Sequence, residues 1–160
     1  MIDPFLAHRF IVTLNPGDAY LPPRQAAQVV LFAIGGFQEV KGLGADLEVT
    51  TYAEGGVGDY VHQLPVRQSW TRISLRRGLT IGPGLWEWYQ AGLAQSLGAR
   101  RDGSIILLSS AGIPLMSWEF YGGLAAKWTG PEFNAMQSAV AMEAVEIAHH
   151  GVRQVSVFSL

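Results

Sequence analysis

The stretch WTRISLRRGLTIGPGLWEWY, residues 70–89, indicates the fold class, because it places an amphipathic strand directly before an amphipathic helix. Residues 70–77 show the two-residue period of a strand with one buried face. The expected inward set is Thr71, Ile73 and Leu75, and the outward set is Arg72, Ser74 and Arg76. After Gly82-Pro83-Gly84, the residues of one helical face recur at three- and four-residue spacing until Gly98 ends the pattern. That face is Leu85, Trp88, Tyr89, Gly92, Leu93 and Ser96.

The rest of the chain is typical of strands separated by Gly/Pro turns. We expect strands at residues 5–14, 29–34, 37–43, 46–54, 104–108 and 115–121, with the last two forming a hairpin. Residues 15–28 and 55–68 are expected to be loops. Residues 134–150 stay ambiguous, because their Ala, Met, Glu and Gln content favours helix while local alternation favours strand. The residues thus predict one mainly β domain with one helix, spanning residues 1–160.

The composition points to a chain whose surface is covered by other subunits. Charged residues make up 15% of its 160 residues, against about 25% in an ordinary soluble domain. The net charge is -2, which argues against general nucleic-acid binding, and the absence of cysteine excludes disulfides and thiolate zinc sites. The longest uncharged stretch, residues 103–118, is interrupted by Ser, Gly and Pro and falls short of the roughly 20 apolar residues of a membrane span. With no signal-peptide pattern at the start, we expect a soluble, self-associating protein made in the cytoplasm.

No group of side chains has the spacing of a catalytic or metal site. His149 and His150 are adjacent and would point to opposite faces of a strand. The glycines of residues 55–58 lack the following helix that a phosphate site needs. The carboxylate pairs Glu143/Glu146 and Glu119/Glu132 have nothing that marks them out, and the basic stripe Arg72, Arg76 and Arg77 is typical of a solvated or interface face. We therefore expect no enzyme activity, no metal and no cofactor.

A series of short motifs does follow a recognisable order. It comprises FQEVKGL (37–43), YAEGG (52–56), LP (64–65), ISLRRGL (73–79), LWEWY (85–89), RDGSIIL (101–107), WEF (118–120), KWTGP (127–131) and AMEAVEIAH (141–149). In this order and spacing the motifs resemble the tail tube family of T-even-like phages. They are also similar to the inner tubes of contractile injection systems, such as antifeeding prophages and Photorhabdus virulence cassettes. The resemblance covers residues 3–151.

The resemblance implies a β-sandwich or barrel with one helix, and a strand at residues 141–148. It implies that six copies form a ring whose sheets join into one continuous barrel, and that rings stack into a tube. The implied partners are a sheath protein, baseplate and spike proteins, a tube terminator or cap, and a cargo effector or DNA in the lumen. The particle would be a virion tail or an injection machine, without direct insertion of this chain into a membrane.

The resemblance also implies roles for one region of the chain. The loop 55–68 corresponds to an extended loop that reaches a neighbouring subunit or ring. The expected inter-subunit contacts are Glu54, Asp59, Tyr60 and Arg67. On the preceding strand, alternation places Glu48, Thr50 and Tyr52 toward the lumen, and Leu47 and Val49 toward the core.

Alternatives to the bulk tube remain. Residues 15–28 look longer than the usual connection, and residues 152–160 form a C-terminal extension past the usual end, so an adaptor ring next to the baseplate is one alternative. A monomeric ligand-binding β-barrel is an alternative from another class. A small hydrolase has no supporting motif, since no Gly-x-Ser-x-Gly elbow is present.

Overall fold

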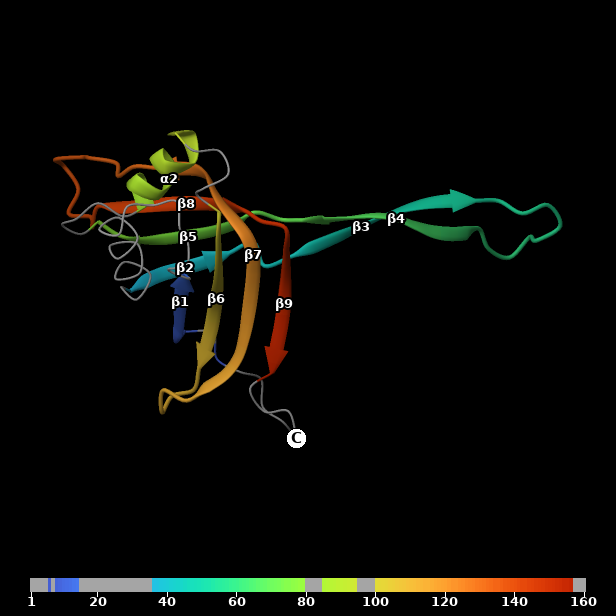
Figure 1. Ribbon diagram of the computed structural model, residues 1–160, viewed down its shortest axis with the longest axis horizontal. Helices are drawn as coiled ribbons and strands as arrows, with labels where there is room; N and C mark the ends of the chain where they lie inside the picture. The colour runs from blue at the N-terminus through green and yellow to red at the C-terminus, as the bar shows by residue number, and fades with distance from the viewer. Residues whose placement is uncertain (1–5, 7, 15–35, 80–84, 95–99, 157–160) are drawn as a thin grey trace.

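Two half-sheets, one helix and a long hairpin arm make up the part of the chain that the computed structural model describes: residue 6 and residues 8–14, 36–79, 85–94 and 100–156 (Figure 1). The elements are β1 (Phe10–Leu14), β2 (Phe37–Lys41), β3 (Ala45–Tyr52), β4 (His62–Trp70), β5 (Ile73–Gly78), α2 (Leu85–Ala94), β6 (Arg101–Leu108), β7 (Pro114–Thr129), β8 (Met142–Ala148) and β9 (Gly151–Ser156). The expected mainly β fold with one helix is confirmed.

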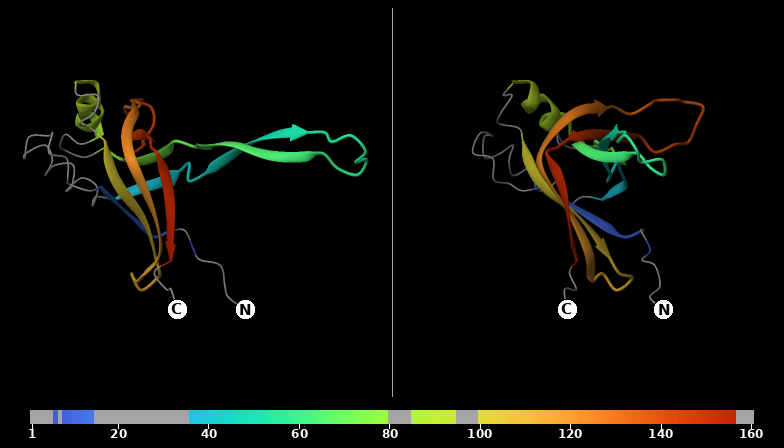
Figure 2. Two further views of the ribbon diagram at one scale, coloured as in Figure 1. Left: turned by 45° about the vertical axis from the view of Figure 1, so that its right-hand side comes forward. Right: turned by 90° about the vertical axis from the view of Figure 1, so that its right-hand side faces the viewer.

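Strand β7 belongs to both half-sheets and joins them. Its first part pairs with β6 and β9, and its last part pairs with β8, which pairs in turn with β5. We call the group β1–β6–β7–β9 half-sheet A and the group β7–β8–β5–β2 half-sheet B. Between the two parts, Gly122 has a φ of 60°, which favours glycine, and a Cβ there would lie 2.7 Å from Nδ1 of His150. At this point β7 curves from the strand direction of half-sheet A into that of half-sheet B (Figures 1 and 2).

The core lies between the half-sheets and under α2. Ile73 and Leu75 are fully buried on β5, as the alternation predicts, and they pair across to Ile147 and Val145 of β8. The full buried apolar cluster is Val12, Leu14, Phe37, Ile73, Leu75, Leu85, Trp88, Ile105, Phe120, Ala125, Val145 and Ile147. Burying side chains of this size contributes about 1.5–3 kcal/mol each.

The helix is confirmed, with one correction to its buried face. Leu85 and Trp88 are buried, and Trp86 packs on Trp128 of β7 with ring centroids 4.7 Å apart. Leu93, expected on the buried face, is 71% exposed, because the helix packs on the body through its first turns. Ser96 and Gly98 lie outside the described residues.

The structure corrects one of the segments expected from the sequence and assigns others. The expected loop 55–68 is wrong in its second half, because residues 62–70 are β4, which pairs with β3 over its whole length. Residues 142–148 are strand β8, which resolves the ambiguous segment as the resemblance implied. The hairpin of β6 and β7 is confirmed. The expected strand 29–34 and the segment 15–28 lie outside the described residues.

The end of the described chain is part of half-sheet A. Strand β9 pairs with β7 from Met116 to Tyr121. Residues 151–156 therefore form an integral edge strand. No helix among the described residues is long and apolar enough to cross a membrane.

Candidate assembly interface

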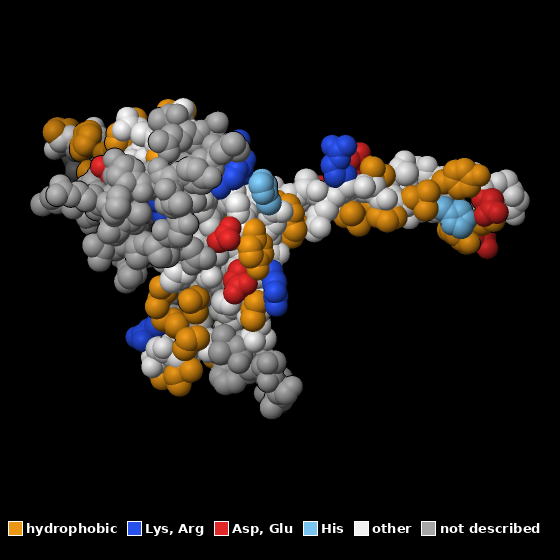
Figure 3. All heavy atoms as spheres, in the orientation of Figure 1, with side chains coloured by type: hydrophobic (Ala, Val, Ile, Leu, Met, Phe, Trp, Pro, Cys, Tyr) orange, Lys and Arg blue, Asp and Glu red, His pale blue; other side chains and the backbone are white. Residues whose placement is uncertain are grey.

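Strands β3 and β4 form an antiparallel arm that extends away from the body (Figure 1). Every residue of β3 is exposed, and Figure 3 shows hydrophobic side chains along the arm. Leu47 is 53% exposed and Val49 is 44% exposed, so the prediction that they face the core of their own subunit is wrong. An isolated two-stranded hairpin is at best marginally stable in water, and no other strand among the described residues pairs with this one.

The register of the arm separates a mainly polar face, which also carries Leu64 opposite Thr50, from a more apolar one. Glu48 lies opposite Arg67, and Tyr52 lies opposite His62, so both pairs share the face of Thr50. The other face carries Leu47, Val49, Thr51, Gln63, Pro65 and Gln68. The register shifts between Glu48 and Val49, which is a β-bulge that increases local twist. Arg67, expected at a subunit contact, thus shares a face with the expected lumen residues.

At the tip of the arm, Glu54, Tyr60 and Tyr52 lie around His62. Glu54 Oε2 lies 2.8 Å from His62 Nε2. The Tyr60 ring meets the His62 ring edge-on at 5.1 Å between centroids, and the Tyr52 ring lies 6.3 Å away. Asp59 lies in the same tip loop. His62 could not be identified from the sequence, because it falls within the expected loop 55–68 and only the strand register pairs it with Tyr52.

The root of the arm is fixed by contacts between distant segments. Gly42 has a φ of 89°, and a Cβ there would lie 1.9 Å from the Arg72 carbonyl oxygen, so only glycine fits. His149 Nε2 lies 2.8 Å from the Thr71 carbonyl oxygen, which makes it the donor of a hydrogen bond. The Trp70 ring lies 6.0 Å from the His149 ring. These contacts fix the direction in which the arm leaves the body.

A buried ion pair joins β5 and β8 below the helix. Arg77 Nε donates to Glu143 Oε1 at 2.6 Å, the side chains of both residues are 5% exposed, and Trp128 Nε1 donates to Glu143 Oε2 at 3.4 Å. Burial lowers the pKa of Arg77, and the adjacent Glu143 carboxylate opposes that change. Arg77 is therefore not part of a solvated basic stripe. The register also places Glu143 and Glu146 on opposite faces of β8, which excludes them as an acid–base pair.

The open face of half-sheet B is densely charged. One row runs across its four strands through Lys41, Ser74, Glu146 and Lys127, and a second runs through Glu39, Arg76, Ala144 and Thr129. Glu39 pairs with Lys41 and, at 3.8 Å, with Arg76, while Arg72 lies 3.5 Å from Glu146. The hydrogen bond from Lys41 is the main reason that the pKa of Glu39 is lowered. No large apolar side chain stands in these two rows.

The open face of half-sheet A differs in kind. One row carries Ile11, Ile106, Ser117 and Val155 across its four strands, and the next carries Thr13, Ser104, Glu119 and Arg153. The Tyr121 hydroxyl donates to Glu119 Oε2 at 2.9 Å, and this hydrogen bond raises the pKa of Tyr121. This face therefore combines aliphatic side chains with ion-pairing groups.

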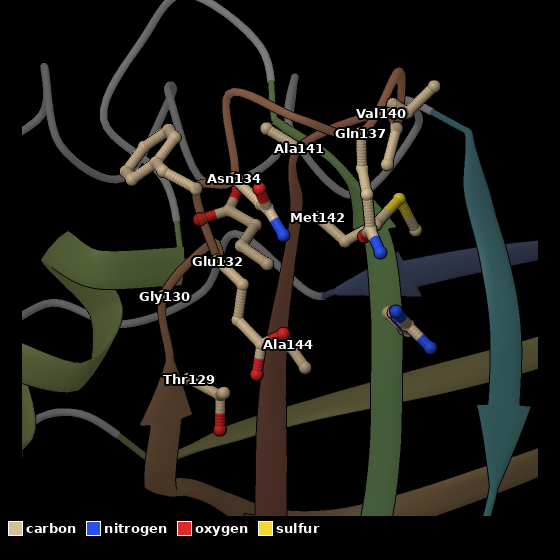
Figure 4. Close-up of a pocket in the computed structure, with 13 residues that line it drawn as sticks. Thr129, Gly130, Glu132, Asn134, Gln137, Val140, Ala141, Met142 and Ala144 are labelled. Atoms are coloured by element: carbon tan, nitrogen blue, oxygen red, sulfur yellow. The ribbon is translucent and has the colours of Figure 1, made fainter.

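A loop over residues 130–141 arches beside the end of half-sheet B and encloses a hollow of about 900 Å³ (Figure 4). Glu132, Asn134 and Gln137 of the loop line this hollow, together with Met142 and Ala144 of β8. Phe133, Met136 and Val140 of the same loop are 82%, 92% and 73% exposed. No cluster of metal-ligating side chains occurs among the residues that the structure describes.

Three solved structures share the fold of this chain. A chain of the anti-feeding prophage (AFP) baseplate superposes with a TM-score of 0.80 and 22% identity, covering 98% of this chain and 99% of that chain. A chain of the AFP tube-terminating cap has a TM-score of 0.77 and 23% identity, covering 98% and 94%. A chain of the PVC sheath–tube complex in its extended state has a TM-score of 0.75 and 23% identity, covering 96% and 93%.

No curated protein sequence matches the chain significantly. A family does match, over residues 7–153, which is nearly the whole chain. Its description is T4-like virus tail tube protein gp19. The chain belongs to this tail tube protein family.

Proposed function

We propose that this protein is a structural subunit of the inner tube of a contractile phage tail or a phage-like injection system. The observation that carries the proposal is the arm, which has exposed apolar side chains and no partner among the described residues of its own chain. A tube subunit would bury such an arm against its neighbours, and membership of the tail tube family supports this. The role is mechanical and needs no catalytic group.

Open strand edges support ring formation. Within the described part of the chain, the outer edge of β2 has no strand partner, and neither does the edge of β7 opposite β8 over residues 124–129. Exposed edges invite pairing with another chain, and closing them between copies removes that hazard. Pairing β2 of one copy with β7 of the next would join six half-sheets B into a barrel around a lumen.

The arm would then link subunits or rings. Its tip residues Glu54, Asp59 and Tyr60 would contact a neighbour, with Arg67 adding a charged contact farther along. Glu48, Thr50 and Tyr52 would extend the polar lining of the lumen, and Leu47 and Val49 would be covered by the neighbouring subunit. The surrounding partners would be a sheath, a baseplate and a terminating cap, in line with the complexes from which the matched structures come. A cargo would occupy the lumen.

Negative-stain electron microscopy with light-scattering mass tests this proposal. Concentrated wild-type protein should give six-fold rings or stacked tubes. Replacing Tyr60 and Glu54 by alanine should reduce assembly, because both lie at the exposed tip, while the matched change Glu132→Ala on the exposed loop should not. A chain that stays monomeric even when particle baseplates are added would refute the tube function and favour the ligand-binding barrel.

A further inference from the structure

The open face of half-sheet B carries more positive than negative charge, although the chain as a whole does not. Four cations stand there, Lys41, Arg72, Arg76 and Lys127, against two carboxylates, Glu39 and Glu146. The face therefore has a net charge of +2, while the whole chain has a net charge of -2.

The ion pairs on this face do not neutralise all of its positive charge. Glu39 is shared between Lys41 and Arg76, and Glu146 is engaged with Arg72. Lys127 is exposed, lies directly opposite Glu146 in the register, and has no ion pair among the described residues. A ligand with negative charge would find Lys127 and the shared cations available.

We infer that the open face of half-sheet B is the wall of the lumen and that it selects an acidic protein as cargo. This inference rests on the proposed tube function. Both rows described on this face are free of large apolar side chains, which a passing cargo would stick to, whereas one row of the open face of half-sheet A carries Ile11, Ile106 and Val155. In a closed tube the surplus charge of every copy would face the same enclosed space, and such a cavity focuses the field on its contents.

The two glutamates favour an acidic protein over a nucleic acid. A nucleic-acid surface neutralises a continuous line of phosphates with Lys and Arg, and carboxylates interspersed among the cations would repel that line. A protein with a surplus of Asp and Glu also carries some basic groups, and these can form ion pairs with Glu39 and Glu146.

Retention of charged probes by assembled tubes tests the inference. Tubes would be incubated at low salt with fluorescent poly-glutamate, with poly-lysine of equal length, or with a single-stranded oligonucleotide, and then sedimented. Lys127→Glu should lower poly-glutamate retention by about threefold or more and should not lower poly-lysine retention, because it brings the net charge of the face to zero. The matched change Arg153→Glu, on the open face of half-sheet A, should leave poly-glutamate retention unchanged. At about 1 M salt, where the Debye length is about 3 Å, the difference should vanish.

Each other result has a distinct meaning. A loss of retention with Arg153→Glu and not with Lys127→Glu would overturn the choice of wall, and retention of the oligonucleotide above poly-glutamate would overturn the choice of cargo. Absence of tubes under every condition would refute the proposed function instead. In that case fluorescence anisotropy of labelled poly-glutamate, mixed with the separate chain, still tests the preference for negative charge. Equal poly-glutamate binding by wild type and Lys127→Gln would refute that preference.

Discussion

Replacing Arg77 by methionine should destabilise the folded subunit by about 3–5 kcal/mol, because it leaves the buried Glu143 carboxylate without its cation. Glu143 is 5% exposed, so water cannot take over the role of the guanidinium group. The remaining donor, Trp128 Nε1, is 3.4 Å from the carboxylate, too far for a strong hydrogen bond. Since small domains have free energies of unfolding of about 5–15 kcal/mol, the loss is a large share of the total.

Urea unfolding followed by tryptophan fluorescence measures this effect on the separate subunit. Arg76→Met is the matched control, because Arg76 is the neighbouring residue on the exposed face, and it should change the free energy of unfolding by less than about 0.5 kcal/mol. The double variant Arg77→Met with Glu143→Leu should be more stable than Arg77→Met alone, since no unpaired charge stays buried. A cost below about 1 kcal/mol for Arg77→Met, or strictly additive single costs, would refute this account of the pair.

Three further changes test other parts of the molecule. Gly42→Ala should cost about 1–3 kcal/mol, measured by urea unfolding, because its φ of 89° and its contact with the Arg72 carbonyl oxygen exclude a Cβ. Ultraviolet titration should place the pKa of Tyr121 above its ordinary value of 10.0, and Glu119→Gln should bring it back toward that value. The stabilisation from this hydrogen bond should therefore be present below pH 10 and be lost as the pH rises through the raised pKa. Deleting residues 152–160 should cause aggregation visible by light scattering, because it removes most of β9 and uncovers an edge of β7. A deletion variant that stays an intact subunit and loses only its joining to the baseplate would contradict this.

Periodicity identified β5 and α2 because each has one buried face. Ile73 and Leu75 on β5 and Leu85 and Trp88 on α2 lie where the spacing predicted. Leu93 continues the same spacing and is exposed, since a helix can carry an apolar stripe farther than its contact surface reaches. Spacing thus predicts a face but not how far that face is covered.

Two features could not be predicted from spacing within one segment. Leu47 and Val49 alternate as core residues would, but nothing in the described part of the chain covers them. Arg77 follows Ile73 and Leu75 in the inward alternation, and this signal was available, but its charge and the adjacent Arg76 suggested a solvated stripe. Only the register that brings Glu143 of β8 opposite Arg77 explains how a guanidinium group is accommodated in the core.

The shared strand β7 links the two half-sheets into one body, so the body and the arm should open at different free energies. Because β7 hydrogen-bonds to β6, β8 and β9, neither half-sheet can open without disturbing the other, and the body should exchange its amide protons only through cooperative opening. The arm has no such link beyond its root, so its amides should exchange rapidly in the free subunit and slowly once a neighbour covers them. Hydrogen exchange would then report the time course of assembly from within the arm, while the protected amides in the part of β7 that pairs with β6 and β9 stay constant as an internal standard.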